Sequence, residues 1–157
     1  MRAGLRDISI REEGLWFRLL TYIAVAIYYF PQEARLVKLG DEALSGEAMS
    51  QLIVNTVYLA VAISVVLSWL FHKQQKQEPM DERDRQIQAR GQVLYSVVMA
   101  SGVLWVMGTI VLQELHLGPG EYLMLTPLMI AHMLLRVLMA ASIASLSLRL
   151  YLYRRGS

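Results

Sequence analysis

The chain has 157 residues, of which 55% are hydrophobic and 18% are charged, and its formal net charge is only +2. Because the charges are packed into short segments between long apolar runs, the composition indicates one integral membrane domain and gives no reason to expect a nucleic-acid partner. The absence of cysteine excludes thiol–disulfide chemistry, thiolate metal sites and iron–sulfur clusters.

The first apolar run predicts a membrane span over residues 14–30. Residues 1–13 are polar and of mixed charge, and they form either a short helix on the membrane surface or a loose tail. No small-residue cleavage site follows the run, so we interpret it as a retained helix rather than a secretory signal. We expect Pro31 to end this helix, and residues 32–50 to connect it to a second span over residues 51–71.

The third helix is expected to begin outside the membrane, near Met80, with Asp81 as its N-cap. No strong breaker follows, so the helix should continue to about Gln113, with residues 92–112 inside the membrane. At 1.5 Å per residue it would be roughly 50 Å long, which exceeds the roughly 30 Å of the hydrocarbon core. Its first turns should therefore project from the bilayer.

A tight turn rich in glycine and proline precedes the fourth helix, which we expect over residues 121–153. Its membrane part should be residues 122–145, and Pro127 should bend it in its first two turns. This helix too is longer than one crossing, so its end should project into the cytoplasm beside the start of the third helix.

The distribution of Lys and Arg predicts the orientation. Twelve of them flank the N-terminal end, the second connection over residues 72–90 and the C-terminal end, whereas the first connection has only Arg35 and Lys38 and the third has none. Cytoplasmic loops of membrane proteins are enriched in Lys and Arg, so both termini are expected in the cytoplasm. The one remaining basic residue, Arg136, lies within the fourth span.

The start of the third helix carries a short charged motif. Asp81, Glu82, Arg83 and Ile87, followed at once by an apolar helix, resemble the D-E-R-x-x-x-I entry to a membrane hairpin in a family of small bacterial and archaeal membrane proteins of unknown function. The resemblance covers little more than this helix. It implies a fold of this kind and a location in the cytoplasmic membrane of a prokaryote, but no chemistry.

The sharpest candidate site is formed by His132 and Arg136, which are four residues apart and therefore share one face of the fourth helix. A charge near the middle of the bilayer costs at least about 2.5–3.5 kcal/mol on insertion scales. The other predicted spans offer no acid at that depth, only neutral groups such as Tyr22 and Ser101. Arg136 is therefore interpreted as a lone intramembrane cation.

Three hypotheses for Arg136 stay open. In the first, its role is structural, and it donates to hydroxyls and carbonyls of the bundle or reaches toward local water. In the second, it contacts another subunit or a lipid headgroup. In the third, it binds an anionic solute in a transport path, and His132 is a proton-responsive neighbour; the simpler alternative for His132 is a hydrogen-bonded core histidine.

The charged residues Asp81, Glu82, Arg83 and Asp84 form a candidate docking surface for a cytoplasmic partner, although a solvated helix start is the simpler alternative. The positive end of the helix dipole already accounts for the acids, and the interleaved arginines oppose a divalent cation. We therefore predict no metal site. The three histidines lie at different depths, so no pair could ligate a haem, and no other cofactor is expected.

Small residues predict close helix contacts. Two pairs on the fourth helix have small-xxx-small spacing, and the third helix has a similar surface around Gly102; the paired residues are Ala140 with Ala144 and Ala141 with Ser145. We expect the third and fourth helices to pack tightly against each other.

These observations predict an all-α, polytopic membrane protein with four spans. No catalytic motif is present, so an enzyme is not expected. The first function hypothesis is a non-enzymatic membrane protein that acts through self-assembly or through a membrane or cytoplasmic partner. The alternative is a small transporter or channel for an anionic solute that uses Arg136. It would need to be oligomeric, because one four-helix bundle leaves little room for a polar path.

Overall fold

The residues described by the computed structural model form four α-helices and lie within the ranges 10–40, 46–71, 81–115 and 126–155. Each helix is long and apolar enough to cross a membrane, which confirms the all-helical fold class with four candidate spans. The helices are α1 (Ile10–Leu39), α3 (Glu47–Phe71), α4 (Glu82–Glu114) and α5 (Pro127–Arg155).

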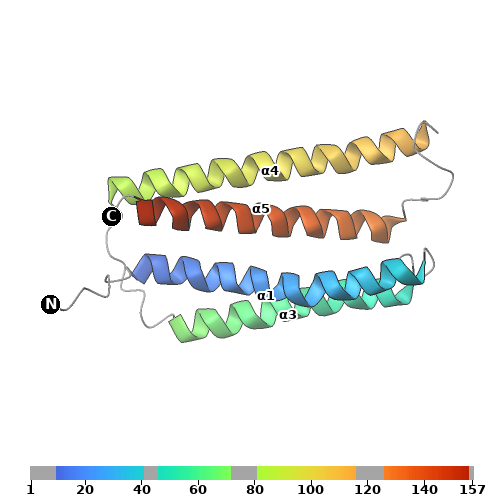
Figure 1. Ribbon diagram of the computed structural model, residues 1–157, viewed down its shortest axis with the longest axis horizontal. Helices are drawn as coiled ribbons and strands as arrows, with labels where there is room; N and C mark the ends of the chain where they lie inside the picture. Colours follow the sequence, from blue (N-terminus) through green and yellow to red (C-terminus); the bar gives the residue numbers. More distant parts are fainter. Residues whose placement is uncertain (1–9, 41–45, 72–80, 116–125, 156–157) are drawn as a thin grey trace.

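The helices pack as a row in the order α3, α1, α5, α4 rather than as a closed bundle (Figure 1). The α4–α5 interface is the most extensive, α1 packs against both α3 and α5, and α3 touches α5 only slightly. Within the described residues, α4 contacts neither α1 nor α3. Consecutive helices run antiparallel, so the starts of α1 and α4 lie at the same end as the last turns of α3 and α5.

Helix α1 continues through Pro31, so the expectation that this proline ends it was wrong. Proline removes one backbone donor and crowds the preceding turn, but membrane helices tolerate this when neighbouring helices hold them in place. The helix ends at Leu39, and the next residue, Gly40, has a φ of +99°, the left-handed conformation typical of a residue that follows a helix. Residues 32–39 therefore belong to α1 and bring Glu33 into the helical array.

The beginning of α4 agrees with its sequence signal. Asp81 is the N-cap, and its Oδ1 accepts from the backbone N–H of Glu82 at 2.6 Å. At 33 residues the helix is roughly 50 Å long. Pro79 and the turn before α5 lie outside the described residues.

Helix α5 begins at Pro127, so this proline occupies the first helical position and does not lie in the interior as expected. Proline is favoured there because its fixed φ suits a helix and the N–H it lacks would have no partner. Thr126 precedes it, and the Thr126 Oγ1 accepts from the backbone N–H of Met129 at 3.3 Å. No bend of α5 is needed to accommodate Pro127.

Close backbone approach characterises the α4–α5 interface. A methyl group at Gly102 would lie 2.3 Å from Cγ1 of Val137, so only glycine fits this spacing. The Ser145 hydroxyl donates across the interface to the carbonyl of Gly91 at 2.8 Å. Ala141 and Ser145 are buried, while Ala144 is half-buried and Ala140 is exposed.

Candidate functional site

Four polar side chains from α1 and α5 meet between these two helices. Tyr29 and Glu33 are four residues apart on α1, and His132 and Arg136 are four residues apart on α5, so each pair occupies one helical face. Thr21 and Val25 continue the α1 face, and both are buried. Because the two helices are antiparallel and in contact, the two polar pairs face each other.

The carboxylate of Glu33 is the centre of this network. Its Oε1 lies 3.4 Å from Nη1 of Arg136 and 3.3 Å from Nε2 of His132. The Tyr29 hydroxyl is hydrogen-bonded to Nδ1 of His132. The side chains of Glu33 and His132 are each only 10% exposed, whereas that of Arg136 is 51% exposed. The guanidinium carbon of Arg136 lies 5.9 Å from the centre of the Phe30 ring.

The interpretation of Arg136 as a lone cation was therefore wrong. Glu33 provides a counter-charge at its depth, and the sequence had placed this acid in a loop because Pro31 precedes it by two residues. Arg136 lies nine residues after the start of α5, roughly 14 Å along the helix. An ion pair at this depth compensates a charge that hydrocarbon alone would penalise.

The hydrogen bonds also restrict how the protons are arranged. If the Tyr29 hydroxyl donates its one proton to Nδ1, the neutral imidazole carries its own proton on Nε2, which faces Glu33. The network is then a neutral tyrosine and histidine beside one Arg–Glu ion pair. It forms a continuous chain of exchangeable protons from a phenol through an imidazole to a carboxylate.

Tyr22 and Ser101 do not join this network. Tyr22 packs against the apolar cluster of Leu19, Leu146 and Leu150 at the other end of the α1–α5 interface. Ser101 is exposed on α4, which does not contact α1 within the described residues. The missed residues are Tyr29 and Glu33, and the matching four-residue spacing on two apolar helices is the signal that could have identified them.

The charged start of α4 is partly used within the chain. The Tyr153 hydroxyl donates to Oδ1 of Asp84 at 2.8 Å, and Nη2 of Arg83 donates to the Tyr153 carbonyl at 3.1 Å. Asp81 caps the helix, and Glu82 is exposed. Three of the four candidate docking residues therefore have intramolecular roles: Asp81 caps α4, and Arg83 and Asp84 fasten the start of α4 to the end of α5.

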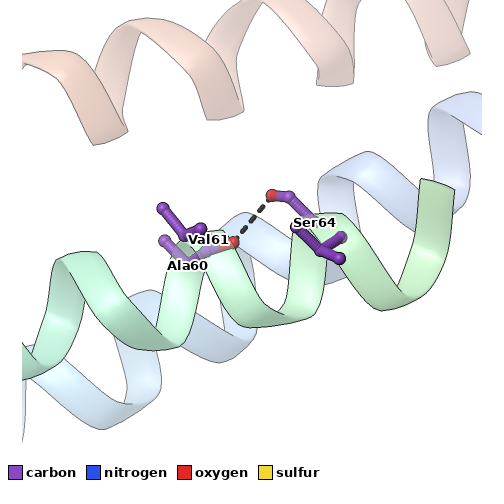
Figure 2. A pocket seen from close by; sticks show the side chains of 4 residues that line it. Ala60, Val61 and Ser64 are labelled. Atoms are coloured by element: carbon purple, nitrogen blue, oxygen red, sulfur yellow. Dashed lines mark hydrogen bonds between the residues drawn. The ribbon is translucent and has the colours of Figure 1, made fainter. Parts of the chain in front are cut away.

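A shallow depression on α3 offers no comparable chemistry. Figure 2 shows that its lining comes from one stretch of α3, and the Ser64 hydroxyl points to the Ala60 carbonyl, to which it donates at 2.7 Å. None of its lining residues is charged. Among the described residues, no group of three or more His, Cys, Asp or Glu side chains is placed to hold a metal ion.

Comparison with known proteins gives no match: no family model, no curated protein and no solved structure is significantly similar to this chain. The resemblance of Asp81, Glu82, Arg83 and Ile87 to the D-E-R-x-x-x-I family therefore stays a prediction.

Proposed function

We propose that the protein is a non-enzymatic, multi-pass protein of a prokaryotic cytoplasmic membrane that acts by assembling with further copies of itself or with a membrane partner. Both termini lie in the cytoplasm. Support for this orientation comes from Arg83, Arg85, Arg90, Arg154 and Arg155, which belong to the shared end of the row, as the positive-inside rule requires for a cytoplasmic side.

The open row of helices is the observation that carries the proposal. In the most apolar stretch of α4, only 6% of the residues are buried inside the protein. The corresponding share is 11% for α3 and 33% for α5. Lipid can cover apolar side chains, but Ser96 and Ser101 are also exposed on α4. Polar side chains on a membrane-facing surface gain more from a neighbouring helix than from lipid, which favours an assembled state.

The polar network gives each subunit a fixed internal geometry. The pairs α1–α3 and α4–α5 are two helical hairpins, and the contacts between them run mainly along α1 and α5. The ion pair of Glu33 and Arg136 lies in this interface. Since such a pair requires good geometry in a low dielectric, it supports one relative placement of the hairpins and so a defined outer surface for assembly.

Counting subunits in native membranes tests this proposal. A single fluorophore fused after Ser157 is bleached stepwise in cells that express the protein at low density. Assembly predicts two or more steps per spot, whereas single steps at all densities would contradict self-assembly. A single-span membrane protein with the same fluorophore is the monomeric control.

Reporter fusions test the proposed orientation. Reporters placed after Ser157 and near Lys76 should both report cytoplasm, and one near Ser45 should report the outside. A cytoplasmic signal from the reporter near Ser45 would contradict the orientation.

Anion transport is the second candidate, and the half-exposed guanidinium of Arg136 favours it. Arginine has five donors in a planar fork, and Nη1 lies 3.4 Å from Oε1 of Glu33. Because the neighbouring carboxylate repels anions, an anion would have to bind at the exposed part of the guanidinium that faces away from Glu33.

Thermal shift measurements test the anion candidate. Anions are screened against the wild type, Arg136→Leu and Arg136→Lys. Transport predicts stabilisation of the wild type that is lost in Arg136→Leu and partly kept in Arg136→Lys. If no anion shifts the wild type, the anion candidate fails.

A further inference from the structure

Asn55 is an exposed amide on an apolar membrane helix. Two neighbouring polar side chains of α3 bond within their own helix: Gln51 donates to Glu47 at 3.0 Å, and Thr56 donates to the Leu52 carbonyl at 2.7 Å. The side chain of Asn55, by contrast, has no hydrogen-bond partner among the described residues. The Asn55 amide has two N–H donors and a carbonyl acceptor. These hydrogen-bonding groups therefore lie unpaired on the exposed surface of α3.

Its depth makes this unused capacity significant. Asn55 lies eight residues from the start of the 25-residue α3, roughly 12 Å along a helix of roughly 37 Å. With about 30 Å of hydrocarbon centred on the helix, the amide lies inside the apolar layer. Lipid chains offer it no hydrogen bond, so burial there is unfavourable unless another polar group meets it.

The residues around Asn55 form a seam with heptad spacing. Positions separated alternately by three and four residues are all exposed along α3: Ala48, Gln51, Asn55, Tyr58, Ala62, Val65 and Trp69. This is the a/d spacing by which two helices pack along each other. The residues that α3 buries, Met49, Leu52 and Thr56, lie on a different face. The small side chains of Ala48 and Ala62 would allow close approach.

We propose that this seam pairs α3 with α3 of a second copy, with Asn55 of each copy hydrogen-bonded to Asn55 of the other. Two copies inserted in the same orientation are related by a two-fold axis along the membrane normal, so their α3 helices run parallel. Each residue on the axis then meets its own counterpart at the same depth. An amide both donates and accepts, so asparagine is complementary to itself, and a single asparagine at an a position fixes the register of such a pair.

This inference rests on the proposed function, because it names the partner and the contact through which the protein assembles. Among possible occupants of the seam, lipid cannot satisfy the amide, and an unrelated helix need not place a polar group at this depth. A second copy does so by symmetry.

The absence of cysteine in the chain allows a direct test by cross-linking in intact membranes. Single-cysteine variants are made on the seam at Gln51 and Ala62, with Asn55 retained, and on the opposite flank of α3 at Val57 and Ser64, which are also exposed. Under a mild oxidant, Gln51→Cys and Ala62→Cys should form disulfide-linked dimers readily. Val57→Cys and Ser64→Cys should form few.

Removing the amide tests its contribution. In the Ala62→Cys background, Asn55→Leu should weaken dimer formation roughly 3- to 30-fold, the range expected for a polar contact between membrane helices, and Asn55→Gln should keep part of it. Equal cross-linking on both flanks, or no loss with Asn55→Leu, would overturn the seam. The subunit count of the wild type distinguishes failure of the seam from failure of the proposed function. If the wild type has two or more subunits but the seam residues do not cross-link, assembly stands and the α3 seam is wrong. If the wild type is a monomer, both proposals are wrong.

Discussion

Gly102 provides the most direct test of the α4–α5 interface. Replacing it with alanine places a methyl group 2.3 Å from Cγ1, 2.7 Å from Cγ2 and 3.0 Å from Cβ of Val137. Carbon atoms attract best at about 3.5–4.0 Å, so the helices would have to separate locally by about 1 Å. Valine in a helix strongly prefers one rotamer, so Val137 cannot readily turn both methyl groups away.

The expected cost of Gly102→Ala is about 1–3 kcal/mol, the usual penalty for overpacking a close contact. Gly108 is the matched control, because it lies on the same helix and a methyl group there would have no atom within 4 Å. Alanine is the better helix former by up to about 1 kcal/mol, so Gly108→Ala should be neutral or mildly stabilising.

Unfolding of the purified variants in mixed micelles by a denaturing detergent gives the comparison. Adding Val137→Ala to Gly102→Ala should restore much of the lost stability, because it removes both methyl groups from the contact. Equal stability of Gly102→Ala and Gly108→Ala, or no recovery in the double variant, would refute the packing argument.

Three further substitutions test contacts elsewhere. Glu33→Gln should lower the free energy of unfolding by about 1–2 kcal/mol, less than for a fully buried pair because Arg136 is half-exposed. A double variant with leucine at positions 33 and 136 should regain the lost stability in the same unfolding assay. Ser145→Ala should cost about 0.6 kcal/mol by loss of its bond to the Gly91 carbonyl, and an unchanged midpoint would contradict that bond. Tyr153→Phe should loosen the shared end of α4 and α5 at a cost of about 1 kcal/mol; spin labels there should become more mobile, and unchanged spectra would argue against the contact.

The existence of the four helices was predictable because each contains a long apolar run, a signal that survives errors at the ends. Asp81 was also predictable as a cap, since its side chain can accept from a backbone N–H of the first turn whatever the tertiary structure. The α4–α5 contact could be anticipated from small residues such as Gly102 and Ala141, although spacing alone did not show that Ala140 faces outward.

The two prolines show where local reasoning fails. At Pro31 the local cost of an interior proline is offset by packing of α1 against two neighbouring helices, which sequence alone does not show. At Pro127 the same residue type starts a helix. Whether a proline lies at the first position of a helix or in its interior depends on where the first hydrogen-bonded turn forms, and the sequence pattern did not locate that turn. Because the helix was predicted to end at Pro31, Glu33 was assigned to a loop. Arg136 was therefore interpreted as a cation without a counter-charge.

A density map of the particle purified in lipid nanodiscs would show whether the protein works as an assembly of rigid four-helix subunits. We expect more than one copy per particle, with the α3 seams in contact at Asn55 and the Glu33 carboxylate against Arg136 inside each subunit. A single copy surrounded by lipid, with Arg136 turned away from Glu33 toward a bound anion, would contradict it.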